Sequence, residues 1–153
     1  MWQRIQTLYL ALAAGLTAAL FFSVKAFMLG PGGVRAQEWT YVQFYPYLVL
    51  LIVVTLLHLL ALGSYKFRVF QMRTAVLAAL LLLALQAWIA VDYFMAEDAL
   101  VFRYTAVFPL VAFILDVLAA RAIFRDQLLV ESASRLRSMK KNGKLRLSSL
   151  QAV

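Results

Sequence analysis

YPYLVLLIVVTLLHLLALGS, residues 45–64, is the stretch that decides the fold. It contains no Asp, Glu, Lys or Arg and a single histidine, His58, and its length matches the ~20 mainly apolar residues that a helix needs to cross the hydrocarbon core of a bilayer. Three more stretches have this character, at about residues 7–29, 74–93 and 104–120. The chain is therefore predicted to cross a membrane four times.

The composition also indicates a lipid environment. Of the 153 residues, 65% are apolar and only 14% are charged, and the mean hydropathy is +0.84. A soluble domain of this size needs more polar residues to cover its surface, so lipid must be the solvent for most of this chain. There is no cysteine, which excludes disulfides and cysteine-ligated zinc or iron–sulfur clusters.

Short connections separate the four stretches. The first connection opens with the turn-forming residues 30–33, and the later connections lie near residues 65–73 and 95–103. Short connections favour antiparallel neighbouring helices. We therefore expect an all-α fold, an integral membrane four-helix up-down bundle over residues 1–120, followed by a cytoplasmic helical extension.

The orientation of the bundle follows from its Lys and Arg residues. One side has twelve of them, and the opposite side has only three: Lys25, Arg35 and Arg103. The twelve are Arg4, Lys66, Arg68, Arg73, Arg121, Arg125, Arg135, Arg137, Lys140, Lys141, Lys144 and Arg146. By the positive-inside rule, both termini are expected in the cytoplasm.

A cleaved signal peptide is an alternative for the first stretch, because Val24 and Ala26 have the small-residue spacing of a cleavage site. However, the apolar stretch before them is longer than the ~7–15 residues usual in signal peptides, and only Arg4 supplies a basic flank. We therefore expect this stretch to remain as the first span.

Two pairs of polar residues lie at matching depths within the spans. Lys25 and Asp92 are near the outer ends of the first and third spans, where they could form an ion pair or extend separately to the headgroups. His58 and Asp116 lie deeper and could meet between the second and fourth spans. The second pair is interpreted mainly as an interhelical bridge, with a proton route as the alternative.

Small residues form a ridge on the first span, where Ala11, Gly15 and Ala19 are four residues apart. Such a ridge lets helix backbones approach closely. Packing within the bundle is the favoured interpretation, and contact with a second copy or a partner's helix is the alternative.

The segment after residue 120 is predicted to be a basic cytoplasmic helix over residues 121–141, ended by Asn142 and Gly143 and followed by a flexible tail, residues 142–153. Asp126 has no basic neighbour three or four residues away on this helix. We expect it to join the start of the segment to another helix end through a basic residue on the same side, with Arg4, Lys66 and Arg73 as the candidates.

The basic segment is expected to attract a polyanion. Membrane lipid with anionic headgroups is the favoured partner, at roughly 1 kcal/mol per basic residue near the surface. Nucleic acid is not expected, because no aromatic residue follows Phe124 to stack on bases.

Residues 3–14, QRIQTLYLALAA, and residues 121–137, RAIFRDQLLVESASRLR, together resemble a family of small four-pass inner-membrane proteins from Bacteroidota, classed as a domain of unknown function. The resemblance implies four spans in a bacterial inner membrane with both motifs in the cytoplasm, and it implies no activity. In the family pattern an acidic residue often precedes the final Arg-Leu-Arg, where this chain has Ser134. The motif positions that the resemblance emphasises are Arg4, Gln6, Arg121, Asp126, Ser132, Arg135 and Arg137.

No motif of a soluble enzyme is found, and a single histidine cannot build an imidazole-rich metal or haem site. No catalytic residue, metal or cofactor is expected. The favoured hypothesis is a non-enzymatic accessory or assembly subunit whose basic segment docks a protein partner or anionic lipid. The alternative is a small transporter or proton-coupled carrier that uses His58 and Asp116.

Overall fold

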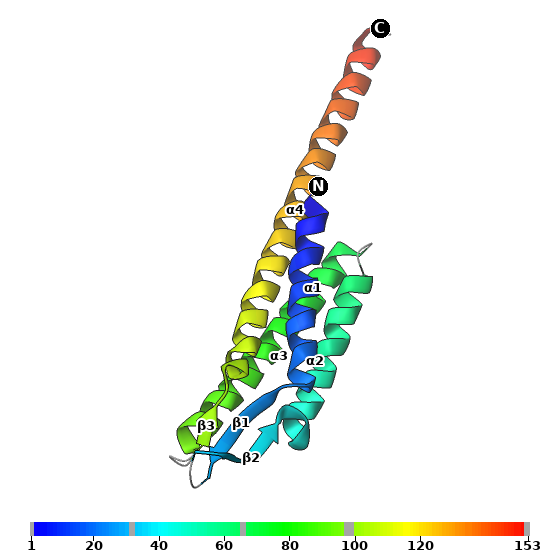
Figure 1. The fold of residues 1–153 in the computed structure, drawn as a ribbon. Coiled ribbons are helices and arrows are strands. Elements are labelled where there is room, and N and C mark those ends of the chain that lie inside the picture. Colours follow the sequence, from blue (N-terminus) through cyan, green and yellow to red (C-terminus); the bar gives the residue numbers. More distant parts are fainter. Residues whose placement is uncertain (1, 31–32, 65–66, 97–99, 152–153) are drawn as a thin grey trace.

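The computed structural model describes residues 2–30, 33–64, 67–96 and 100–151. Four long helices lie side by side, and a small sheet covers one end of the bundle (Figure 1). The helices pack in a ring, each against two neighbours, so the predicted all-α four-helix bundle is confirmed. The helices are α1 (Trp2–Phe21), α2 (Tyr45–Gly63), α3 (Arg68–Met95) and α4 (Phe108–Gln151). The other elements are β1 (Val24–Leu29), β2 (Arg35–Thr40), β3 (Leu100–Phe102) and the 3-10 turns η1 (Tyr41–Gln43) and η2 (Tyr104–Val107).

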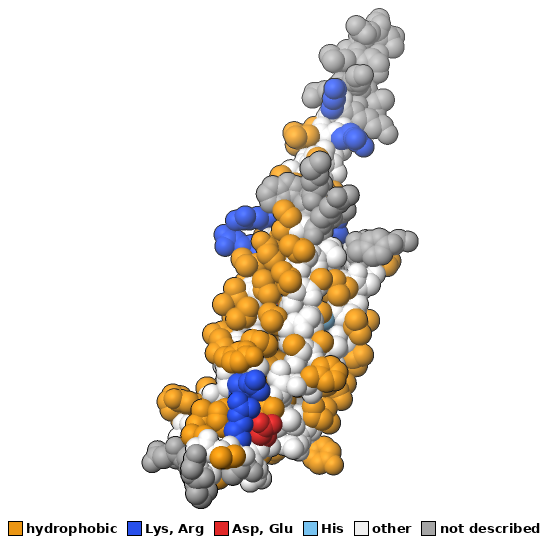
Figure 2. Space-filling model, viewed as in Figure 1, with side chains coloured by type: hydrophobic (Ala, Val, Ile, Leu, Met, Phe, Trp, Pro, Cys, Tyr) orange, Lys and Arg blue, Asp and Glu red, His pale blue; other side chains and the backbone are white. Residues whose placement is uncertain are grey.

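Three of the helical segments are long and apolar enough to cross a membrane: Tyr45–Gly63, Arg68–Met95 and Tyr104–Lys140. The apolar part of α1, Ile5–Phe21, is shorter. Hydrophobic side chains cover the bundle on the face shown in Figure 2, whereas basic side chains gather toward its ends and on the projecting part of α4. An apolar exterior of this extent is typical of a protein whose solvent is lipid.

The first helix is shorter than predicted. It ends at Phe21, and residues 24–29 form β1, the central strand of a three-stranded antiparallel sheet with the order β2-β1-β3. The prediction of a span to residue 29 was wrong because β1 is nearly as apolar as a span, while its backbone hydrogen bonds go to β2 and β3. Gly33, with a φ of +76°, allows the tight turn between β1 and β2.

The fourth helix is longer than predicted. It runs through Asn142 and Gly143 to Gln151, so the predicted helix end was wrong, and the predicted tail is helical up to that residue. Residues 152–153 lie outside the described residues. One glycine costs about 1 kcal/mol in a helix interior. The good helix formers around it, such as Lys141, Lys144 and Leu145, offset that cost. In Figure 1, α4 extends far beyond the N-terminus.

Candidate functional site

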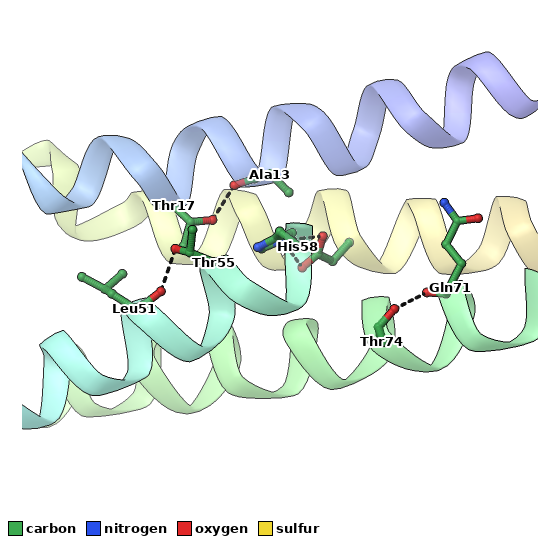
Figure 3. Close-up of polar contacts among 8 residues, drawn as sticks. Ala13, Thr17, Leu51, Thr55, His58, Gln71 and Thr74 are labelled. Carbon is green, nitrogen blue, oxygen red and sulfur yellow. Dashed lines mark hydrogen bonds and ion pairs between the residues drawn. The ribbon is translucent and has the colours of Figure 1, made fainter. Parts of the chain in front are cut away.

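Polar side chains are buried at intervals along the bundle, namely Gln6, Thr17, His58, Gln71, Thr74, Thr105 and Asp116. The threonine hydroxyls within the helices donate to carbonyls of the preceding turn, as Thr17 does to Ala13 at 2.5 Å and Thr55 to Leu51 at 2.7 Å (Figure 3). These hydroxyls are therefore satisfied within their own helices. The polar contacts that join one helix to another are made by the charged, amide, imidazole and Tyr47 side chains.

His58 and Asp116 meet in the interior, as the sequence predicted for an interhelical bridge. The Nε2 of His58 on α2 lies 3.0 and 3.1 Å from the two carboxylate oxygens of Asp116 on α4, and both side chains are 0% exposed. This is the geometry of an N–H donated to both oxygens. A charge or dipole at such a site is retained only with a close partner, so the pair fixes how α2 and α4 face each other.

Lys25 and Asp92 also meet, at the end of the bundle that the sheet covers. The Lys25 ammonium on β1 pairs with Oδ2 of Asp92 on α3, and the Tyr47 hydroxyl on α2 donates to the same oxygen at 2.5 Å. The Lys25 Nζ lies 4.6 Å from the centre of the Tyr47 ring. The three residues form a cluster that ties the sheet to two helices.

A cavity of about 460 Å³ adjoins this cluster. Lys25, Tyr47 and Asp92 line one part of it, and Trp39 and Phe44 supply aromatic surface. Tyr41 is buried nearby, with its ring centre 6.1 Å from that of Tyr47. Burial raises the pKa of the Tyr41 phenol above its ordinary value, so its hydroxyl remains protonated at neutral pH. In the described part of the chain, no three His, Asp or Glu side chains gather as metal ligands would.

At the opposite end, two contacts fasten the other helices to α4. Gln6 on α1 donates from Nε2 to the carbonyl oxygen of Ala122 at 3.1 Å. Asp126 pairs with Arg68 at the start of α3, with 2.9 Å between Oδ2 and the nearer guanidinium nitrogen. The predicted link from Asp126 to another helix end is present, but its partner among the described residues is Arg68 rather than Arg73. The side chains of Arg4 and Lys66, the other candidates, lie outside the described residues.

The small-residue ridge does not face the interior. Ala11, Gly15 and Ala19 are exposed on the outer surface of α1, and a Cβ added to Gly15 would meet nothing within 4 Å. The interpretation as packing within the bundle was therefore wrong, because the rotation of α1 is set by its larger buried residues, among them Leu10 and Leu20. Contact with a second copy or with a partner's helix stays a prediction.

The basic residues of α4 from Arg121 to Lys140 are exposed. Arg135 pairs with Glu131 one turn earlier at 2.8 Å, whereas Arg121, Arg125 and Arg137 make no ion pair with a described residue. Ser132 donates to the Leu129 carbonyl of its own helix at 2.9 Å. The structure thus places the predicted motif residues of α4 on a surface that begins at the bundle and continues along the projecting helix.

Two residues of these clusters have roles that the sequence did not predict. No role was predicted for Tyr47 from the sequence, and Arg68 was treated only as one of twelve charges on one side. Their contacts depend on helix rotation, which a single sequence does not specify. The approximate depth of Tyr47, close to that of Lys25 and Asp92, was the one available signal.

The fold and these contacts define a class of protein, a four-helix bundle with an apolar exterior and helices joined by ion pairs. A family model described as "Domain of unknown function (DUF4293)" matches residues 2–136, and the chain belongs to this family. The predicted membership of a family of unknown function is thereby confirmed. The curated proteins and the solved structures with which the chain was compared give no match.

Proposed function

We propose that the protein is a non-enzymatic subunit of a membrane assembly in a bacterial inner membrane, with both termini in the cytoplasm. In this proposal the bundle is the membrane anchor, and the projecting part of α4 docks a cytoplasmic protein with an acidic surface. The observation that carries the proposal is that residues 128–140 of α4 are all exposed and extend past the bundle (Figure 1).

The distribution of charge supports the orientation. Arg68, Arg73, Arg121 and Arg125 lie toward the end of the bundle where α1 begins, before the exposed basic residues of the projecting helix. Of the basic residues that the structure describes, only Lys25, Arg35 and Arg103 lie on or directly after the strands of the sheet at the other end (Figure 1). The excess of basic residues at the first end corresponds to a cytoplasmic side by the positive-inside rule.

The direction of α4 favours a protein partner over the lipid surface. From Arg121 to Arg137 the helix rises about 24 Å at 1.5 Å per residue. If the bundle stands upright in the bilayer, this rise exceeds the ~8 Å over which surface charges act at physiological salt. Arg137 and Lys140 are then too far from the headgroups to be held by them, and they are available to an acidic protein.

The projecting helix also presents apolar side chains. Leu129, Leu136 and Met139 are 64%, 68% and 70% exposed, and they alternate with the basic residues. Helices that dock in a groove of another protein commonly combine apolar anchors with charges at the rim. The partner inferred here therefore has a groove with an apolar floor and acidic edges.

Site-specific photo-crosslinking in bacterial membranes tests this proposal. With the crosslinker at position 139, a discrete adduct with a cytoplasmic protein is expected. The adduct should be lost in the double variant Arg137→Gln, Lys140→Gln and kept in Arg121→Gln, Arg125→Gln, which has the same change in charge nearer the bundle. Adducts with lipid only, or equal yields in both variants, would refute the proposal.

A proton-coupled carrier centred on His58 and Asp116 is the alternative. The two side chains are fully buried and are directed at each other, which is better explained as a fixed bridge between helices. Flux measurements in vesicles reconstituted with the protein distinguish a fixed bridge from a carrier. A pH-dependent flux that His58→Leu abolishes would favour the carrier.

A further inference from the structure

A groove runs along the surface where α1 packs against α4, at the end of the bundle where Gln6 contacts Ala122. It has a volume of about 350 Å³. Its apolar lining includes Ile5, Tyr9, Leu118 and Leu129, and its basic lining consists of Arg121 and Arg125. The groove thus combines an apolar floor with two guanidinium groups one helical turn apart.

The two arginines are not neutralised within the described part of the chain. The acidic residue of the groove, Asp126, is paired with Arg68, and neither Arg121 nor Arg125 has an ion pair with a described residue. Both side chains are exposed. Because the Asp126 carboxylate is already paired with Arg68, the two adjacent guanidinium groups favour a ligand with a phosphate, whose oxygens accept the paired N–H donors of arginine.

The apolar floor determines which phosphate compound fits. Ile5 and Leu118 are 44% and 41% exposed, and they continue the groove toward the hydrophobic surface of the bundle. Inorganic phosphate has no apolar part that could contact these side chains. The acyl chains of a phospholipid can pack against them as they pack against the rest of the apolar surface of the bundle. Basic pockets between helices at the cytoplasmic side of a membrane are known to suit anionic headgroups.

The geometry points to a binding site for one anionic phospholipid in the groove between α1 and α4, with its headgroup phosphate at Arg121 and Arg125 and its acyl chains along Ile5 and Leu118. This site rests on the membrane orientation proposed above, and it does not depend on the docking of a protein by residues 128–140.

Lipid retention by the full chain tests the site. The protein is reconstituted in vesicles of phosphatidylcholine containing one-fifth phosphatidylglycerol, extracted in mild detergent and analysed by native mass spectrometry. The wild type should retain one phosphatidylglycerol, and Arg121→Gln, Arg125→Gln should reduce that retention at least tenfold. The control Arg137→Gln, Lys140→Gln has the same change in charge and should retain lipid as the wild type does.

Thermal unfolding provides a second measurement that distinguishes lost binding from lost folding. In phosphatidylcholine alone, all three proteins should unfold at the same temperature, because the substituted arginines are exposed and have no described partner. Phosphatidylglycerol should raise the unfolding temperature of the wild type and of the control, and should leave Arg121→Gln, Arg125→Gln unchanged. Inorganic phosphate at millimolar concentration should have no effect.

Equal lipid retention in the two double variants, or equal retention of both lipids by the wild type, would overturn the site. If instead the site holds and the photo-crosslinked adduct is missing, only the docking function fails.

Discussion

Residues 108–123 and residues 124–140 belong to one continuous helix, α4, but their surroundings differ. In the first part, burial recurs every three or four residues, at Pro109, Ala112, Asp116, Ala119 and Ile123. In the second part, every side chain from residue 128 to residue 140 is exposed. Packing against α1 and α3 stabilises the first part, whereas the second depends on helix propensity and on nucleation by the first.

Three acidic residues lie at successive positions along α4, from the buried part to the exposed part. The side chains of Asp116, Asp126 and Glu131 are 0%, 19% and 52% exposed, and each has a basic partner. Similar pairs on one helix therefore differ in how much they contribute to the free energy of unfolding, because the cost of leaving a charge unpaired depends on how far it is removed from water. Substitutions along this series should therefore have effects that decrease from the bundle toward the C-terminus.

The largest effect is expected at the buried pair. His58→Leu leaves the Asp116 carboxyl without a partner in the interior of the bundle. Breaking a buried ion pair costs about 3–5 kcal/mol in soluble proteins, whereas polar contacts between membrane helices reach only about 1.7 kcal/mol. We expect a loss of about 2 kcal/mol in the free energy of unfolding, measured by denaturant titration of the purified protein in detergent micelles.

The double variant His58→Leu, Asp116→Leu separates a bridge from simple packing. It removes both polar groups, so it should be less destabilised than the sum of the two single variants. Additive losses would show that the two side chains do not stabilise each other, and the interpretation of this pair as a bridge would be wrong.

An intermediate effect is expected at the junction. Asp126→Asn removes the charge that pairs with Arg68, at a site that is only partly exposed. A loss of about 1 kcal/mol is expected for a pair of this exposure, which lowers the unfolding temperature by about 3 °C in a chain of this size. The measurement is thermal unfolding in detergent.

The matched control for this contact uses the neighbouring arginines of α3. Arg68→Gln should destabilise the protein about as much as Asp126→Asn, and adding it to Asp126→Asn should cost little more. Arg73→Gln, an exposed site on the same helix, should have no effect. If Arg73→Gln proves the more harmful of the two, Asp126 has a different partner in solution.

These residues also show what could be predicted from the sequence. His58 and Asp116 were predicted as a pair because the span lengths fix their depths, and depth is a property of position along the chain. The partner of Asp126 could not be predicted, because Arg68 and Arg73 are only about 7.5 Å apart along α3. Both are within reach of a long side chain, and the rotation of α3, which packing sets, selects between them. Likewise, hydropathy could not reveal β1, since Val24–Leu29 is apolar enough to resemble the end of a span.

The smallest effect is expected on the projecting helix. Glu131→Gln removes the ion pair with Arg135, in which the side chains are 52% and 73% exposed. Pairs of this spacing contribute about 0.3–0.5 kcal/mol to a helix, and salt screens them. The substitution should therefore leave the unfolding temperature of the bundle unchanged and speed amide hydrogen exchange about twofold, only near residues 131–140. In 1 M salt the variant and the wild type should exchange at the same rate. A change in the unfolding temperature of the bundle would mean that residues 124–140 pack against the rest of the protein, and the contrast between the two parts of α4 would then not hold in solution.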